Sequence, residues 1–364
     1  MQLSTVIAGL ERVAPLAYQE NYDNAGLYCG DLSTSVHRIL TTLDITEEVI
    51  DEAIKLECQL IVAHHPILFK PIKRLVGQSY VERCLLKAVR HNVALYAAHT
   101  NLDNSHGGVN FKLAQKLGLR NVQVLEPMRE SLSKLVVFVP LESTEHVLDA
   151  LYKAGAGQLG NYKNCSFRVE GTGAFTPAEG AAPFIGQLHR QEEVKENRIE
   201  VFFPHYLSDQ IVTKMREAHP YEEVAYYIQD ISNLNQEAGA GAIGELETSL
   251  NAGDFLAHLK SVLPVEVVRF TPWTKKIHRV AVCGGAGSFL LKKAISRGAD
   301  AFVSADFKYH EFFEAEGRVM IADIGHYESE FYTKELLLEL LKAQGQEIEV
   351  FISTANTNPI RYHV

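Results

Sequence analysis

Two neighbouring histidines, His64 and His65, follow a short apolar run and precede a proline in the segment IVAHHPILF at residues 61–69. The apolar run predicts a buried strand, and Pro66 indicates that the strand ends there. Side chains alternate between the two faces of a strand, but at a strand end the backbone turns and both rings can face one point. An imidazole pair at such a place indicates either a metal site or two surface histidines.

Further histidines and carboxylates follow other predicted strands of the chain. In open α/β sheets, ligands bind at the carboxyl ends of the strands, so we expect these side chains to gather at one edge. They are His99 and Asp103 after residues 93–98, Asp306, His310 and Glu311 after residues 300–305, and His326 and Glu330 after residues 319–324.

His326 and Glu330 have the spacing that places two side chains on one face of a helix beginning after Gly325. A carboxylate in the first turn is also favoured by the helix dipole. One ion needs three or four ligands, whereas five ligands with a bridging carboxylate suit two ions roughly 3.5–4 Å apart. The predicted metal ligands are His64, His65, Asp103, His326 and Glu330.

The remaining polar residues of these segments have other predicted roles. His99 is interpreted as a residue that orients a ligand, since a lone histidine is more often a partner of a site than part of it. Asp306, His310 and Glu311 indicate either the start of a solvated helix or a substrate contact. In the second case, His310 or Glu311 would transfer protons.

Two loops are candidates for substrate binding. The run CGGAG at residues 283–287, which includes Gly285, could bind an anion through its backbone amides. It lacks the spacing of the known phosphate-binding motifs. The segment NYDNAG at residues 21–26 is predicted to be a turn, in which Asp23 and Asn24 could line a pocket.

The composition narrows the classes of partner. The 364-residue chain is 46% hydrophobic and carries a net charge of −10, with a pI of about 5.8. This excess of negative charge argues against binding of nucleic acid or anionic membranes, which requires a basic face. Five cysteines without a C-x-x-C pair fit reduced thiols. Because neither a signal peptide nor a long apolar run is recognisable, we expect a cytoplasmic protein.

The element pattern changes twice along the chain. Strands and helices alternate in residues 1–128 and again in residues 236–364, which predicts one α/β domain in two halves. Residues 129–235 have the order β-α-β-β-α-β of a ferredoxin-like α+β insert. The segment at 232–246 is rich in Asn, Gly and Ala and is interpreted as a linker. The expected metal site lies at the strand carboxyl ends of this discontinuous domain.

Several motifs together resemble the NIF-three-like family of dinuclear metal proteins. These are AHHP at 63–66, AAHTNLD at 97–103 with GGVN at 107–110, and GHYESE at 325–330. The segments YDNAGLYCGD at 22–31 and SADFKYHE at 304–311 also fit. AHPYEEVAYYI at 218–228 is similar to the PII/CutA-like insert of the longer bacterial members. The resemblance covers nearly the whole chain.

The resemblance implies a particular arrangement of the five ligands. His65 and Asp103 would bind one ion, His64 and His326 the other, and Glu330 would bridge the two. It also implies a ring-like homohexamer with the metal sites facing an internal cavity. The ligand set suits Zn, Mn or Fe, and does not choose among them.

The expected reaction class is hydrolysis, since two such ions activate water and polarise a substrate. The family is often described as type 2 GTP cyclohydrolase I. In that scheme a metal-bound hydroxide attacks C8 of guanine, opens the imidazole ring and releases formate. Two alternatives remain: a dinuclear phosphoester or nucleotide hydrolase, and a metal-binding regulator or scaffold without turnover. The expected partner is a small molecule, of which GTP and other nucleotides are the candidates.

Overall fold

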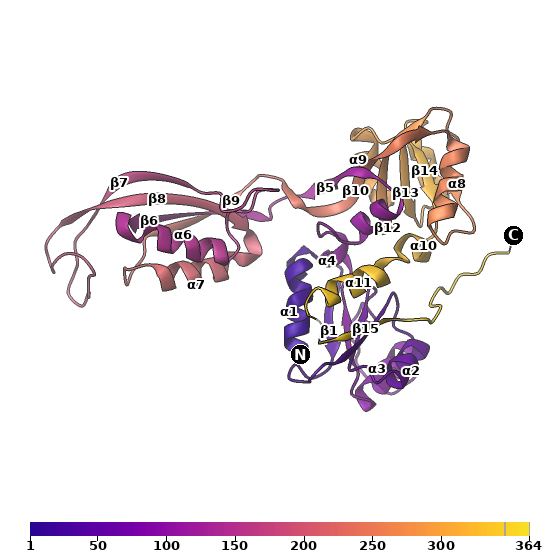
Figure 1. Cartoon of the computed structure of the whole chain (residues 1–364), viewed down its shortest axis with the longest axis horizontal. Helices are drawn as coiled ribbons and strands as arrows, with labels where there is room; N and C mark the ends of the chain where they lie inside the picture. Colours follow the sequence, from indigo (N-terminus) through magenta and orange to yellow (C-terminus); the bar gives the residue numbers. More distant parts are fainter. Residues whose placement is uncertain (346, 364) are drawn as a thin grey trace. The chain divides into compact units, whose positions relative to one another are not determined.

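The computed structural model describes residues 1–345 and 347–363. The chain divides into two compact units, which Figure 1 colours along the sequence. The first unit comprises residues 1–127 and 237–364, and the second comprises residues 128–236. All the side chains of the predicted metal site belong to the first unit, which contains two sheets.

The first sheet has the strand order β1-β4-β3-β2-β15. Strands β15, β2, β3 and β4 run parallel to one another, and β1 is antiparallel to β4. Parallel strands present their carboxyl ends at the same edge, as a ligand site in an open α/β sheet requires. The strands are β1 (Gly26–Cys29), β2 (Arg38–Thr42), β3 (Leu60–Ala63), β4 (Ala94–Ala97) and β15 (Glu349–Ile352).

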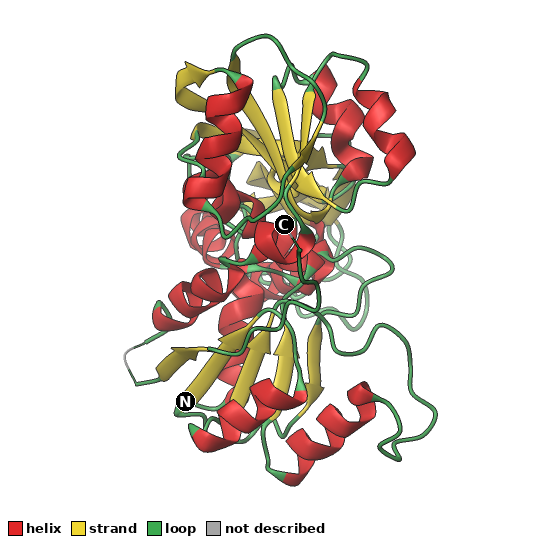
Figure 2. Ribbon diagram, turned by 90° about the vertical axis from the view of Figure 1, so that its right-hand side faces the viewer, coloured by secondary structure: helices red, strands yellow, loops and turns green. Residues whose placement is uncertain are grey.

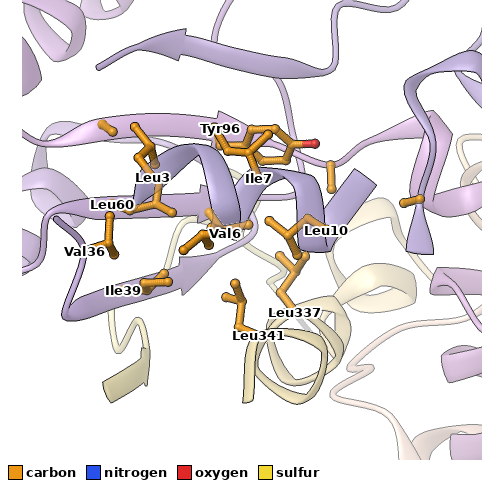
Figure 3. Close-up of a cluster of buried hydrophobic side chains, with 14 of the residues drawn as sticks. Leu3, Val6, Ile7, Leu10, Val36, Ile39, Leu60, Tyr96, Leu337 and Leu341 are labelled. Atoms are coloured by element: carbon orange, nitrogen blue, oxygen red, sulfur yellow. The ribbon is translucent and has the colours of Figure 1, made fainter. Parts of the chain in front are cut away.

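Helices cover both faces of this sheet (Figure 2). Helices α1 (Leu3–Val13) and α11 (Thr333–Lys342) pack on one face, where Figure 3 shows Leu10, Leu337 and Tyr96 in one buried cluster. Helices α2 (Glu47–Lys55) and α3 (Tyr80–Arg90) pack on the other. Thr46 is the N-cap of α2, since its side chain accepts a hydrogen bond from the Val49 amide.

The second sheet of this unit has the order β11-β14-β13-β12-β10-β5. Strands β12, β13 and β14 are parallel, and β10 and β11 pair antiparallel to them. Helices α5 and α8 pack on one face, and α9 and η5 pack on the other. The elements are β5 (Arg120–Met128), β10 (Asn235–Leu250), β11 (Arg269–Phe270), β12 (Ile277–Ala286), β13 (Ala301–Ala305), β14 (Met320–Asp323), α4 (Thr100–Asp103), α5 (Val109–Lys116), α8 (Ala252–Val262), α9 (Leu291–Ser296), η5 (Tyr309–Ala315) and α10 (His326–Glu330).

Two sequence-based expectations are corrected here. The segment 232–246 is not a linker, because most of it belongs to β10, a strand of 16 residues. The helix predicted to begin after Gly325 is also short, since α10 ends at Glu330 and a separate helix, α11, begins at Thr333. The helix start after Gly325 is confirmed.

The second unit is a four-stranded antiparallel sheet with the order β7-β8-β6-β9. Its elements follow one another as β6 (Leu132–Pro140), α6 (Thr144–Lys153), β7 (Phe167–Phe175), β8 (Glu192–Pro204), α7 (Ser208–Ala218) and β9 (Tyr226–Ile231). Both helices contribute to one apolar cluster with Leu135, Val137 and Ile199 of the strands. The helices therefore cover a single face of this sheet.

Within the part of the chain that the structure describes, no helix has the length and apolar character needed to cross a membrane.

Candidate metal centre

The candidate metal centre lies where parallel strands of both sheets end. Five of these strands are each followed within a few residues by a histidine or an aspartate, as expected for a ligand site at strand carboxyl ends. The residues are Asp44 after β2, His64 and His65 after β3, His99 after β4, Asp306 after β13 and His326 after β14.

Glu330 occupies the middle of this group. Its Oε2 atom lies 2.9 Å from His65 Nε2 and 3.2 Å from His326 Nε2. The two imidazole nitrogens are 3.3 Å apart. These three side chains form one group that could hold a metal ion, and His64, His65 and His99 form a second, with ligand atoms within 4.8 Å of one another.

His64 is completely buried, and its Nε2 atom faces two carboxylates beyond hydrogen-bond distance. Asp103 Oδ1 is 3.7 Å away and Glu330 Oε1 is 3.5 Å away. Among the described residues, His64 Nε2 and Asp103 Oδ1 are buried atoms without a hydrogen-bond partner. A buried polar atom without a hydrogen-bond partner destabilises the fold, so such atoms require an explanation. An imidazole nitrogen and carboxylate oxygens converging in this way fit a divalent cation, which binds both donor types at about 2.0–2.2 Å.

The Nδ1 atoms of the four imidazoles are all held by acceptors. His65 donates to Asp44 at 2.8 Å, His99 to Asp23 at 2.8 Å and His326 to Asp306 at 2.7 Å. His64 donates to the Ala98 carbonyl at 2.8 Å. Such partners fix the orientation of each ring and leave its Nε2 atom as the one that a metal ion could bind, as in carboxylate–histidine–metal triads.

The carboxylates and imidazoles shift one another's pKa values strongly. Burial alone would lower the pKa of His65, but Glu330 and the hydrogen bond to Asp44 raise it to about 10. The pKa of His326 rises in the same way to about 11, against the effect of burial. For Glu330, burial would raise the pKa, but the three imidazoles hold it well below its usual range. A cation that binds here must therefore displace protons from the imidazoles.

The turn between β14 and α10 positions His326 and Glu330. Gly325 has φ +90°, a conformation that residues with a Cβ rarely adopt. The buried Asp323 stabilises the turn, since its carboxylate accepts hydrogen bonds from the Gly325 amide at 3.2 Å and the Phe307 amide at 3.0 Å. The four-residue spacing on α10 then directs both ligand side chains to the same point.

A cavity of about 510 Å³ lies next to the candidate metal centre, and all the residues that line it belong to the first unit. His65, His99, Asp103, His326 and Glu330 line its floor. The walls contain Glu20, Tyr22, Asp44, Phe69, Tyr80, Thr100, Asn104, Asn110, Cys283, Gly284, Phe289, Tyr327, Asn358, Pro359 and Ile360, among other residues.

The structure brings three of the four residues predicted to bind substrate close to the ligands. Asp23 accepts from His99 and from the Thr100 amide, and Asp306 accepts from His326. Both carboxylates therefore orient histidines. The Gly285 amide is 2.9 Å from the Ser329 hydroxyl and donates to it, so it is not free to bind an anion.

Asn24, His310 and Glu311 do not line the cavity. The Asn24 side chain donates to the Leu68 carbonyl at 2.7 Å. Glu311 caps its own helix, η5, by accepting from the Lys308 amide at 2.7 Å. The exposed His310 ring contacts Tyr309 and Phe313. This geometry gives no support to proton transfer by His310 or Glu311.

The distances also differ from the pairing that the family resemblance implies. His65 and His326 approach the same oxygen of Glu330, whereas His64 approaches the other oxygen together with Asp103. The geometry therefore groups His65 with His326 and His64 with Asp103.

Sequence reasoning missed Asp44 and the carboxyl-terminal segment. Asp44 follows β2 in the same way that His64 follows β3, which is the signal that could have identified it. Thr357 donates to Asp44 at 2.5 Å, and Asn358 donates to the buried Glu328 at 3.1 Å. The segment has no helix or strand pattern that would place it at the site.

The fold and this site define a mixed α/β protein with several sheets and side chains that could hold a metal ion. Residues 1–359 match the family model described as Duf34/NIF3 (NGG1p interacting factor 3), so the chain belongs to the Duf34/NIF3 family. It is 40% identical to the GTP cyclohydrolase 1 type 2 homolog of Halalkalibacterium halodurans, over 98% of each chain. It is 37% identical to the Bacillus subtilis protein of the same name, over 98% of this chain and 97% of the relative.

Solved structures of the family have the same fold. A Bacillus cereus protein related to NIF3 superposes with a TM-score of 0.87 at 37% identity, covering 100% of this chain and 99% of the other. The Staphylococcus aureus protein SA1388 superposes with a TM-score of 0.79 at 31% identity, with the same coverage.

Proposed function

We propose that this protein is a metal-dependent hydrolase that opens a nitrogen heterocycle in a cyclohydrolase-type reaction. The observation that carries the proposal is the convergence of three imidazoles and two carboxylates, with His64 Nε2 and Asp103 Oδ1 buried and unpartnered among the described residues. The curated relatives are named GTP cyclohydrolase 1 type 2 homologs, which supports this reaction class.

Two divalent ions are proposed to bind at the centre, one on the side of His64 and Asp103 and one on the side of His65 and His326. Glu330 has one oxygen directed to each side and would bridge them. When bound, such ions supply Lewis acidity that makes water a nucleophile near neutral pH. Zn, Mn and Fe all suit these donors.

The chain's own residues would orient the reactants and move the proton. Asp44, Asp306 and the Ala98 carbonyl hold the ligand rings. His99, which is fixed by Asp23 and lines the cavity, would accept a proton at Nε2. In the ring opening, one water molecule adds to a ring carbon, one adjacent C–N bond breaks, and the leaving nitrogen takes the proton. A second water molecule then cleaves the remaining C–N bond of that carbon, so that the carbon leaves as formate and the second nitrogen takes the proton.

The finer organisation of the chain is part of this proposal. Residues 129–235 would be an inserted ferredoxin-like, PII/CutA-like domain, and residues 1–128 and 236–364 the halves of one α/β domain. The order of elements in the second unit and its sheet order β7-β8-β6-β9 support the ferredoxin-like assignment. The homohexamer and the cytoplasmic location stay predictions.

Product analysis tests the proposed reaction. The metal-loaded protein is incubated with GTP and, separately, with guanosine, and formate is measured. We expect the parent protein to release formate from at least one of the two compounds, and Glu330→Gln, which removes the bridging charge, to release none from either. Glu335→Gln, on α11 and paired with Lys116 away from the centre, is the matched control. Orthophosphate without formate, or no product from protein holding two ions, would contradict the proposal.

A further inference from the structure

The cavity above the centre is walled by aromatic side chains. Tyr22, Phe69 and Phe289 line it and are 69%, 55% and 65% exposed. Exposed aromatic residues gathered around one cavity mark a ligand-binding surface rather than a packing remnant. Its volume of about 510 Å³ falls within the range of roughly 300–1,000 Å³ that is typical of small-molecule sites. The walls therefore offer flat apolar surfaces on which a planar ring can stack.

The charged residues of the cavity are unsuited to a polyphosphate. Its lining includes the carboxylates of Glu20, Asp44, Asp103 and Glu330, and within the described chain no lysine or arginine lines it. The cations of the neighbouring loop, Lys70, Lys73 and Arg74, lie outside the lining. Phosphate groups that lie beyond the reach of a metal ion are normally recognised by Arg, Lys or free amides at helix N-termini. Two divalent ions would bring four positive charges, which these four carboxylates would balance.

The backbone amides that could replace such cations are already used. The Gly284 amide donates to Asn110 Oδ1 at 2.9 Å, and the Gly285 amide donates to the Ser329 hydroxyl at 2.9 Å. The amides of Gly284 and Gly285 are therefore not free to bind an anion.

We propose that the substrate is a planar, uncharged nitrogen heterocycle, of the class of a free base or a nucleoside, and not a nucleoside polyphosphate. The ring stacks against Tyr22, Phe69 and Phe289, with its polar edge toward Glu330 and His99. Asn104, Asn110 and Asn358 also line the cavity and provide neutral hydrogen-bonding groups for the ring or a ribose. This substrate class rests on the proposed hydrolase function and makes it more specific.

Binding calorimetry on the metal-loaded full chain tests the proposal without requiring turnover. The probes are guanosine, adenosine, cytidine, pterin, GTP and inorganic tripolyphosphate. We expect guanosine or another uncharged ring to bind at least tenfold more tightly than GTP, and tripolyphosphate not to compete. Tighter binding of GTP than of guanosine, weakening as salt is added, would overturn the proposal. Failure of every uncharged ring to bind would overturn it as well.

Variants test whether the aromatic walls carry the binding. Tyr22→Ala and Phe289→Ala should each weaken binding of the uncharged ring at least fivefold, since stacking on one aromatic side chain has this effect. The metal content should stay unchanged. Tyr162→Ala removes an aromatic that is 74% exposed but outside the cavity, and should have no effect. Equal effects of all three variants would count against the proposal.

The two proposals can fail separately. An uncharged ring that binds to protein with two ions but releases no hydrolysis product would refute the hydrolase function and leave the binding class intact. Release of formate from GTP, with no binding of the uncharged rings, would refute the binding class and leave the hydrolase function intact.

Discussion

The two sides of the candidate metal centre are held in different ways. On one side, His64 is fully buried and its ring is fixed by a backbone carbonyl, that of Ala98. On the other, His65 and His326 are partly exposed and fixed by the carboxylates of Asp44 and Asp306. A carbonyl oxygen orients a ring without adding charge, whereas a carboxylate also raises the basicity of the ligand. We therefore expect the buried side to be the permanent ion site and the exposed side to exchange its ion.

The largest difference in metal content is expected between two single variants, each of which lacks one histidine on one side of the centre. His326→Gln should retain one ion per chain after dialysis, on the side of His64. His64→Gln should lose that ion and also melt at a lower temperature, because a lost buried hydrogen bond costs about 1–3 kcal/mol. Elemental analysis and calorimetry measure both effects. Equal metal loss and equal melting temperatures in the two variants would remove the distinction between the sides.

Replacing the carboxylates that orient the exposed ligands should give the next largest effect. Asp44→Asn and Asp306→Asn should each weaken the exposed-side ion by about 10- to 100-fold, since partners of this kind contribute that much. The buried-side ion should keep its affinity. Metal titration against a chelator measures both sites. Asp51→Asn, an exposed aspartate paired with Lys87, should change neither.

The pH dependence should separate the metal-free protein from the loaded one. The pKa of His65 is raised from 6.5 to about 10, so its protonated form stabilises the metal-free fold. That contribution is complete below about pH 6.5 and is lost as the pH rises toward about 10. The metal-free melting temperature should fall over this interval, while metal affinity rises because fewer protons compete. A metal-free protein that gains stability over the same interval would contradict this.

The smallest effect is expected from the residue that holds Asp44. Thr357 donates to Asp44 Oδ2 at 2.5 Å, so Thr357→Val should weaken the exposed-side ion by roughly two- to tenfold, the equivalent of one hydrogen bond. Thr354→Val is the matched control, since Thr354 lies in the same segment and donates to Glu52 at 2.7 Å. The same chelator titration distinguishes them, and an equal effect of both variants would show that Asp44 is not involved.

Much of the site was predictable because its residues obey simple periodicities. His64 and His65 end an apolar run, and His326 and Glu330 have helical spacing after a glycine. The structure brings these residues together with Asp103. Asp44 was missed because a single aspartate between a strand and a capped helix resembles ordinary helix-start chemistry. The cavity wall at Asn358 was missed because no local sequence pattern describes a segment without helix or strand whose side chains make long-range hydrogen bonds, such as that from Asn358 to Glu328.

The main error in the fold concerned β10, whose small residues resemble a linker. In the structure, the small residues of β10 allow its backbone to lie close to that of β5. A Cβ at Gly239 would lie 2.1 Å from the Glu126 carbonyl oxygen, so a larger side chain is excluded there. Gly-rich sequence usually indicates a loop, but the same composition is required where backbones approach closely. Only the tertiary contact distinguishes the two cases.

The distance along the chain between the partners of the centre has a consequence for biosynthesis. His65 and Glu330 are separated by 265 residues, and the whole second unit lies between them in the sequence. At translation rates of about 5–20 residues per second, the histidine pair leaves the ribosome roughly 13 to 53 s before its shared carboxylate. During that time the nascent chain can present imidazoles but no complete centre. Loading of both ions is therefore expected to follow synthesis of α10, so that a stalled or truncated chain holds its metal weakly and remains open to proteolysis.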